Sequence, residues 1–126
     1  MRPRVSIVND IRINAIALSS IFLVGDAYLL EPRAKVFAIQ REIPIFWRED
    51  TNIDRYSIYT RPIKRPLITE KIKMVVINES PVIKVNSIRI LGISTSAILQ
   101  IGSNKIIDAE ARVKHIRYLA GEERPF

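Results

Sequence analysis

The chain has 126 residues, a formal net charge of +7 and no cysteine. Its length suffices for one folded core without disulfides, and the lack of cysteine excludes thiol catalysis and thiolate zinc sites. The chain has a single histidine, His115, which excludes a multi-histidine metal site. No run of residues approaches the ~20 apolar residues of a membrane helix, and no signal peptide is predicted.

The first predicted element is a strand over residues 5–13, where apolar side chains alternate with polar ones. Such alternation is typical of a strand with one buried face. Asn9 and Asp10 interrupt the alternation, and both residue types readily bond their own backbone. They predict a bulge or a short kink in the middle of the strand.

A hairpin is predicted next, because two β-prone runs at residues 21–24 and 27–30 flank the pair Gly25-Asp26. Glycine supplies the positive φ that a type II′ turn requires at its first central position. The two runs are therefore expected to pair with each other as antiparallel neighbours.

Both faces of this hairpin are apolar, since Phe22 would face Leu29 and Leu23 would face Tyr28. A hairpin of this kind must be covered, either inside the domain or by another chain. We expect it to supply a candidate protein interface, formed by Phe22, Leu23 and Tyr28.

A third strand over residues 34–39 closes the unit, and an insert over residues 41–73 follows it. Within the insert, residues 56–59 are expected to form a short edge strand, and the proline-bounded run after them is expected to be extended. Phe46 and Trp47 are expected to cap one end of the core.

The chain then repeats itself at an offset of 77 residues without a gap. Matching pairs include Val8 and Val85, Asn9 and Asn86, Ile11 and Ile88, Ile13 and Ile90, Ile16 and Ile93, Ile21 and Ile98, and Gly25 and Gly102. A repeat of this kind indicates a repeated supersecondary unit whose apolar face packs on its copy. The second copy has its turn at Gly102-Ser103, and Gln100 would face Lys105 where the first copy has Leu23 and Tyr28.

The last predicted element, residues 111–116, is compatible with a strand or with a helix that would extend over 110–119. The strand is favoured, because the matching segment of the first copy runs into Ile43-Pro44 and cannot continue as a helix.

These elements predict an all-β protein with a single domain over residues 1–126. Two strand–hairpin–strand repeats, at residues 5–40 and 82–117, would be related by pseudo-twofold symmetry and packed together. The irregular insert, with its aromatic residues and prolines, would join them. Gly25, Asp26, Gly102 and Ser103 would hold the turns.

No pattern in the sequence indicates catalysis, because the four glycines form no phosphate-binding loop and Ser19-Ser20 lacks a base partner. We therefore expect no catalytic residue, cofactor or metal. Two alternatives remain. The first is a nucleic-acid-binding β-barrel, since aromatic residues interleave with basic ones at Trp47, Tyr56, Tyr59, Arg61, Lys64 and Arg65. The second is a weak binder of carbohydrates or other small molecules that would use Trp47 as a stacking platform.

The chain resembles the GerPE family of spore germination proteins from Bacillus-type spore formers. The likeness rests on the Ser-Ser-Ile-Phe-Leu-Val-Gly-Asp stretch at 19–26 and the Glu-Ala-Arg-Val-Lys-His-Ile-Arg end at 110–117. Val-Asn-Asp-Ile at 8–11 and Ile-Asn-Glu-Ser-Pro at 77–81 extend it over nearly the whole chain.

The resemblance implies a non-enzymatic protein of the endospore coat that reaches the coat from the mother-cell cytoplasm. It implies that small germinants permeate the coat with the help of the GerP proteins, and that the partners of this chain are other GerP-type coat proteins, in a homo- or hetero-oligomer. It implies no catalytic residue. We expect no membrane insertion, because no apolar run is long enough, and a nucleic-acid partner is disfavoured because the positive charge is spread evenly along the chain.

Overall fold

The computed structural model describes residues 3–41 and 53–118, and within them eight strands, one short α-helix and one 3-10 turn. The first repeat contains β1 (Val5–Ile13), β2 (Ile21–Val24), β3 (Ala27–Leu30) and β4 (Arg33–Arg41). The insert contributes η2 (Ile53–Arg55) and α1 (Ser57–Thr60), and the second repeat contains β5 (Val82–Ile90), β6 (Ile98–Ile101), β7 (Asn104–Ile107) and β8 (Glu110–Tyr118). The predicted all-β class with two repeats is confirmed, and so is the strand over 110–118.

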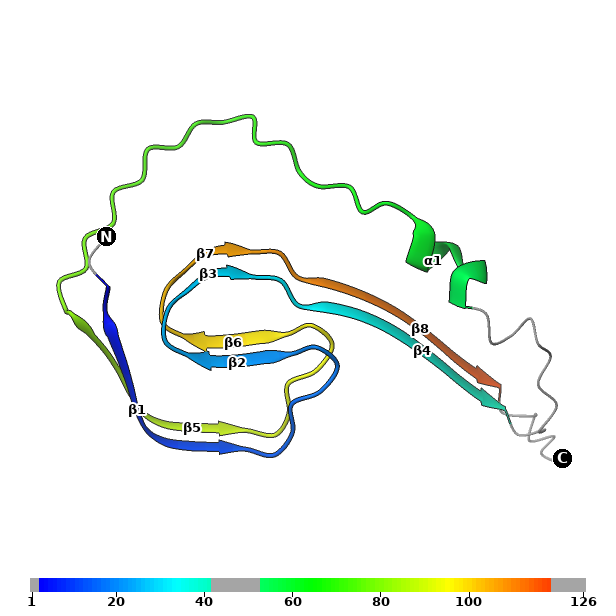
Figure 1. Ribbon diagram of the computed structural model, residues 1–126, viewed down its shortest axis with the longest axis horizontal. Helices are drawn as coiled ribbons and strands as arrows, with labels where there is room; N and C mark the ends of the chain where they lie inside the picture. Colours follow the sequence, from blue (N-terminus) through cyan, green and yellow to red (C-terminus); the bar gives the residue numbers. More distant parts are fainter. Residues whose placement is uncertain (1–2, 42–52, 119–126) are drawn as a thin grey trace, which may run out of the picture. The chain divides into compact units, whose positions relative to one another are not determined.

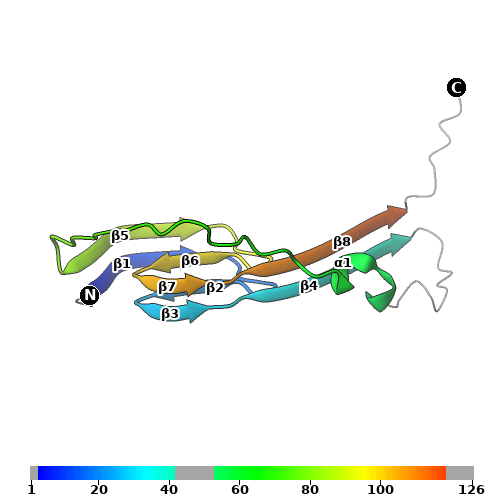
Figure 2. The ribbon, with the colours of Figure 1, turned by 90° about the horizontal axis from the view of Figure 1, so that it is seen from above.

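Every strand pairs with its own counterpart in the other repeat. The four sheets are β1–β5, β2–β6, β3–β7 and β4–β8, each of two strands. The first three pairs are parallel and in register at the offset of 77, as in Ile21 with Ile98 and Val24 with Ile101. Figure 1 shows the paired strands following the same path, and Figure 2 shows one repeat as a layer above the other.

The predicted antiparallel hairpins and the pseudo-twofold symmetry are therefore wrong. The two strands that flank Gly25 do not pair with each other, since β2 pairs with β6 and β3 pairs with β7. Parallel pairing in register relates the repeats by a translation along the hydrogen bonds. A twofold axis would either reverse one strand of each pair or turn the same edge of both strands toward each other, and neither arrangement gives a parallel ladder. The chain turns at Gly25 so that β3 folds back over β2, and the backbone bonds run to the other layer (Figure 1).

The middle of β1 has a kink and no bulge. The register of β1 on β5 is the same before and after Asn9, with Val8 opposite Val85 and Asp10 opposite Ser87, so neither strand has an extra residue. Both strands bend at the same place in Figure 1. At the bend, Asn9 Nδ2 donates to Asn86 Oδ1 at 3.1 Å.

Contacts divide the chain into two compact units, which are described separately. The first unit comprises residues 1–34 and 65–110, and β2–β6 lies between the other two pairs in its serpentine path (Figure 1). Its described core is small, and consists of Leu30, Ala34, Ile88 and Ile93 together with Ser96, whose hydroxyl donates to the Glu110 carbonyl at 2.7 Å.

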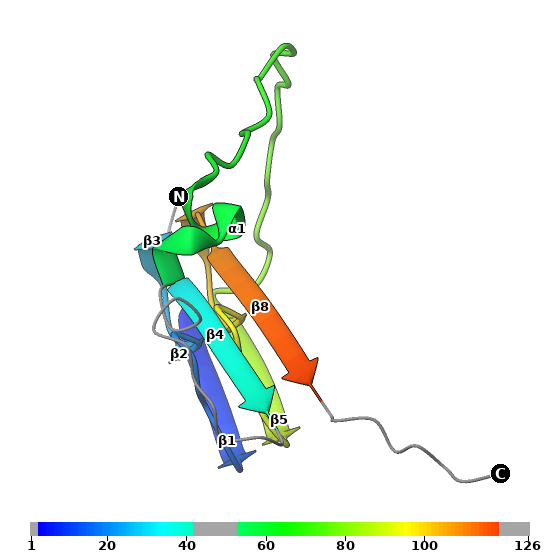
Figure 3. The ribbon, with the colours of Figure 1, turned by 90° about the vertical axis from the view of Figure 1, so that its right-hand side faces the viewer.

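The second unit comprises residues 35–64 and 111–126, and contains most of β4 and β8. The two strands run side by side in Figure 3. The short edge strand predicted over 56–59 is wrong, because this segment forms α1, a single helical turn from Ser57 to Thr60. The proline-bounded run after it has neither helix nor strand, as expected. Phe46 and Trp47 lie outside the described residues.

Candidate assembly surface

The two repeats are joined by a backbone ladder that continues through the turns as well as the strands. Outside the strands, the Gly25 N–H donates to the Ile101 carbonyl and the Ala27 N–H donates to the Ser103 carbonyl, both at 2.9 Å. At the preceding bend, the Ser96 N–H donates to the Leu18 carbonyl at 2.9 Å. Pairing in a turn requires both copies to have the same local backbone conformation.

The positive φ angles show this equivalence directly. They occur at matching positions in the two repeats, and the pairs are Leu18 and Thr95, Ser19 and Ser96, and Gly25 and Gly102. Two successive non-glycine residues in the left-handed region cost on the order of 1–2 kcal/mol each. The matching strain in the two copies indicates that the path of the turn is fixed by the stacking.

The predicted turn residues hold the two layers together. The Ser103 N–H donates to Asp26 Oδ1 at 2.8 Å, so the Asp26 side chain bridges the layers. A Cβ atom at Gly102 would lie 2.0 Å from the Gly25 carbonyl oxygen, so the second turn has no room for a side chain. Gly25, with a φ of +131°, has no atom within 4 Å of its virtual Cβ.

Gln100 has a role that sequence reasoning missed. It does not face Lys105 as the hairpin register required; its Nε2 donates to the carbonyls of Gly25 and Ser103, each at 3.0 Å, and its Oε1 accepts from Asn104. The matching residue of the first repeat, Leu23, lies opposite Gln100 in the ladder and cannot make these bonds. The feature of the sequence that points to this role is a single amide residue, Gln100, between apolar residues and next to the Gly102-Ser103 turn.

The candidate interface residues lie in β2 and β3. Phe22 and Leu23 are half-buried, whereas Tyr28 is exposed and has Lys105 Nζ 5.4 Å from its ring centroid. The structure thus places Leu23 beside Gln100 and Tyr28 beside Lys105, in two separate ladders. Their role in binding another protein stays a prediction.

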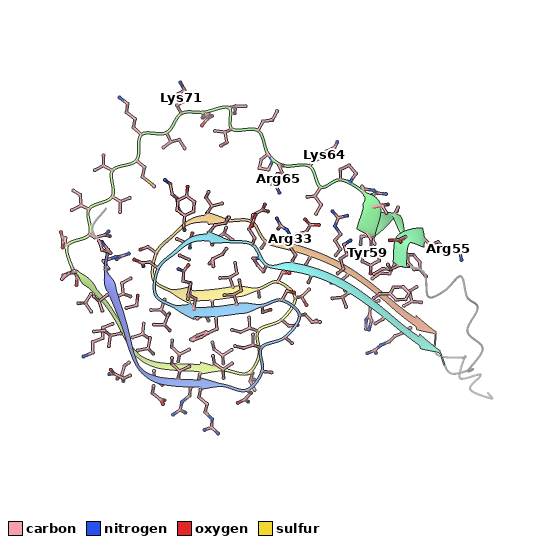
Figure 4. The ribbon with its side chains drawn as sticks, in the orientation of Figure 1. Arg33, Arg55, Tyr59, Lys64, Arg65 and Lys71 are labelled. Atoms are coloured by element: carbon pink, nitrogen blue, oxygen red, sulfur yellow. The ribbon has the colours of Figure 1, made fainter. Side chains whose placement is uncertain are left out.

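A charged cluster also joins the layers, and the sequence did not reveal it. Arg33 donates to the Asp108 carboxylate, with its Nη2 3.0 Å from Oδ2, and also to the Asp108 carbonyl at 2.6 Å. Arg65 reaches the same Oδ2 at 2.7 Å (Figure 4). The hydrogen bond from Arg33 lowers the pKa of Asp108 below its ordinary value, and the nearby positive charges of Arg33 and Arg65 add to that effect.

In the second unit, the two tyrosines in the described part of the insert pack on the strands. The Tyr59 side chain is buried, points from α1 toward the strands in Figure 4, and donates its hydroxyl hydrogen to the Val36 carbonyl. Tyr56 stacks on Phe37 with 5.3 Å between ring centroids, and Lys114 Nζ lies 4.3 Å from its ring centroid. Because Tyr59 is buried, it offers no free face of the kind that a nucleic-acid stacking platform needs.

Arg112 fixes the other end of this helical turn. Its Nη1 donates to the carbonyls of Ile58, Tyr59 and Arg61 at 3.1, 2.7 and 2.9 Å, which satisfies groups that a helix end leaves without partners. A hollow of about 390 Å³ beside it is lined by residues 57–58, 61–63 and 111–112. No group of three or more metal-ligating side chains occurs within the described residues.

The segment after this turn leaves its apolar side chains in solvent. All residues from 65 to 81 are exposed, including Leu67, Ile68, Ile72, Met74, Val75, Val76 and Ile77. Ile68 is 95% exposed and Leu67 is 88% exposed. Large exposed apolar surfaces are typical of sites that contact other molecules, so this segment is a candidate assembly surface.

No helix in the described part of the chain is long and apolar enough to span a bilayer. His115 is an exposed residue of β8, as expected. Arg61 and Lys64 are exposed as well, and they follow the α1 turn.

Comparisons with known proteins agree with the resemblance seen in the sequence. Residues 5–125 match the family model of the spore germination protein GerPE. The chain is 32% identical, over 98% of its own length and 97% of the relative's, to a probable spore germination protein GerPE from Bacillus cereus. No solved structure matches the chain.

Proposed function

Because the chain belongs to the GerPE family of spore germination proteins, we propose that it is a non-enzymatic structural protein of the endospore coat. In this role it assembles with other GerP proteins and thereby helps small germinants to permeate the coat. A protein of this kind works through its surfaces, so the proposal requires a surface that a partner can cover.

The observation that carries the proposal is the exposed apolar segment over residues 67–77. Its seven apolar side chains stay in water in the isolated chain, and burying one such side chain stabilises a complex by about 1.5–3 kcal/mol. The segment is extended and has no strand partner among the described residues. An extended apolar segment can add to the open edge of a sheet in a partner, which gives main-chain bonds and side-chain pockets together.

The test is co-expression of this chain with the other GerP proteins, followed by affinity purification and size-exclusion chromatography. Ile68→Glu combined with Val75→Glu places charges in the segment and is expected to abolish co-purification. Thr69→Glu combined with Asn78→Glu is the matched control, because it adds the same two negative charges at exposed polar positions of the same stretch, and it is expected to retain the partners. Equal co-purification of both variants would contradict the proposal.

The permeability role has its own test in spores. Spores that carry the Ile68→Glu and Val75→Glu variant are expected to germinate slowly in response to small germinants. Chemical removal of the coat is expected to restore their rate, because the receptors beneath the coat are unchanged. If the delay persists in decoated spores, the defect does not lie in permeation and the proposed function is wrong.

A further inference from the structure

Each layer of the stacked repeats has an outer edge that pairs with no other described strand. All four sheets in the described part of the chain are two-stranded, so a strand that pairs on one side is open on the other. The outer edge of β1, β2 and β3 is called the repeat-1 edge, and the outer edge of β5, β6 and β7 is called the repeat-2 edge. Open edges of this kind are templates for pairing with another chain.

The backbone groups at the two edges can be assigned from the ladder. The N–H of Ile21 donates to Ala97 and the N–H of Gly25 donates to Ile101. Successive residues of a strand direct their backbone groups to opposite sides. Within β2, Phe22 and Val24 therefore direct theirs to the repeat-1 edge.

The same alternation applied to β6 gives the complementary pattern. Ala97 and Ile101 accept from the first repeat, so Ile98 and Gln100 direct their backbone groups to the repeat-2 edge. Ile98 and Gln100 are the counterparts of Ile21 and Leu23, the residues through which β2 meets β6. The repeat-2 edge thus has the same arrangement of free backbone N–H and C=O groups as the side of repeat 1 that pairs with repeat 2. A further layer can therefore pair with the repeat-2 edge in the same way.

The turns also leave room for a further layer. The virtual Cβ of Gly102 points at the Gly25 carbonyl in the layer next to it, whereas that of Gly25 points into open space. The matching φ angles in both repeats give the two layers the same path through their bends. A third layer with the same path can therefore lie beside Gly25 on its open side, as close to Gly25 as the turn of repeat 1 lies to Gly102.

We propose that a second copy of this chain stacks on the repeat-2 edge through its own repeat-1 edge and continues the parallel, in-register ladder. The template for this contact is the interface between the two repeats of the chain itself. The apolar columns, such as Ile11 with Ile88, and the amide bond between Asn9 and Asn86 would continue across it. The contact joins two different edges and relates successive copies by a translation, so it does not close and produces a growing stack.

Charge sets the conditions for this stacking. Arg12 lies opposite Arg89 in the β1–β5 ladder, and a second copy would place its Arg12 against Arg89 of the first. Like charges at this spacing repel one another, and salt screens the repulsion between exposed groups. Stacking is therefore expected to increase with ionic strength, whereas binding to a nucleic acid would weaken.

The test uses sedimentation of the full-length chain over a wide range of concentrations and at low and high salt. Val24→Pro removes an N–H from the repeat-1 edge only, and proline is tolerated in an edge strand where its nitrogen faces solvent. Val24→Ala is the matched control, since it shortens the same side chain and keeps the N–H. Ile98→Pro, with Ile98→Ala as its control, blocks the repeat-2 edge in the same way.

The wild-type chain and both alanine variants are expected to form large species that grow with concentration and salt, and each proline variant is expected to stay monomeric. An equimolar mixture of the two proline variants is expected to stop at a dimer, because each variant supplies the edge that the other lacks. Circular dichroism shows whether each variant keeps its strands. A wild-type chain that is monomeric throughout, or a folded proline variant that assembles as the wild type does, would overturn the proposal.

This inference specifies one partner for the assembly role in the proposed function, and the two can fail separately. If the chain stays monomeric alone but co-purifies with other GerP proteins, self-stacking is wrong and the proposed function stands. If the chain stacks while spores with Ile68→Glu and Val75→Glu germinate normally, self-stacking stands and the proposed function is wrong.

Discussion

Substitution of Gly102 by alanine probes the close approach of the two turns. The new Cβ would lie 2.0 Å from the Gly25 carbonyl oxygen and 2.5 Å from its carbonyl carbon. Both are backbone atoms, so the contact can be relieved only by moving one layer away from the other. Gly25→Ala is a matched control, because its φ is also positive but its Cβ would have no neighbour within 4 Å.

The expected magnitudes separate the two variants. Backbone strain from a side chain at such a φ destabilises each variant by about 1–3 kcal/mol. Gly102→Ala adds the cost of overpacking, which is typically about 1–3 kcal/mol. Gly102→Ala should therefore lower the free energy of unfolding by about 1–3 kcal/mol more than Gly25→Ala does, because strain is common to both.

The assay is equilibrium unfolding in urea followed by circular dichroism, at concentrations where both variants are monomeric. Equal losses in the two variants would show that the turns do not approach each other. A larger loss for Gly25→Ala would refute the order of the layers as well.

The remaining predictions concern single contacts. The protein should lose stability as the pH falls below 3.8, the ordinary pKa of Asp108, and through the lowered pKa of the folded state. Asp108→Asn should remove this part of the acid sensitivity, as measured by unfolding curves at pH 7 and pH 3. Identical pH profiles for the variant and the wild type would contradict this prediction. Tyr59→Phe should lower the free energy of unfolding by about 1–3 kcal/mol, because it leaves the Val36 carbonyl without its donor. Tyr28→Phe, at an exposed position, should cause no loss measurable by urea unfolding. Equal losses in the two variants would count against the packing of Tyr59. Gln100→Leu should cost about 1–2 kcal/mol by the same assay, since two turn carbonyls lose a donor, and an unchanged midpoint would contradict that role.

The strands and the repeat could be predicted from the sequence because both depend on local patterns. Alternation identified β1 and β5, and the gapless offset of 77 identified the second copy. The strand pairing could not be read in the same way. Two β-prone runs around a Gly-Asp pair are compatible with a hairpin and with a turn that folds one strand over the next, since the alternation of side chains is the same in both.

The signal that separates these two arrangements was present in the repeat itself. Parallel stacking in register places each residue on its own counterpart, so like pairs such as Ile21 with Ile98 form continuous columns. In a hairpin each residue would instead face a residue of the other strand of its own repeat, such as Leu23 facing Tyr28, and no column of like residues from the two copies would form. The gapless match of like residues is therefore a signal for stacking as well as for symmetry.

The contacts of the insert were beyond sequence reasoning for a different reason. The α1 turn is only four residues long, too short for a helical periodicity to appear. It is held by Arg112 and by the Tyr59 hydroxyl, whose partners are backbone carbonyls. Bonds to backbone carbonyls carry no sequence signature at the accepting residue.

Two designed cysteine pairs test the parallel stacking of the repeats most directly, since the chain has no cysteine of its own. Leu23→Cys with Gln100→Cys joins residues that lie opposite each other in the β2–β6 ladder, and Leu23→Cys with Tyr28→Cys joins residues that only a hairpin would bring together. Neighbouring strands hold facing Cα atoms within the range that a disulfide spans. On mild oxidation of dilute, monomeric protein, the account predicts an intramolecular disulfide in the first pair and free thiols in the second. A disulfide in the second pair together with free thiols in the first would contradict it.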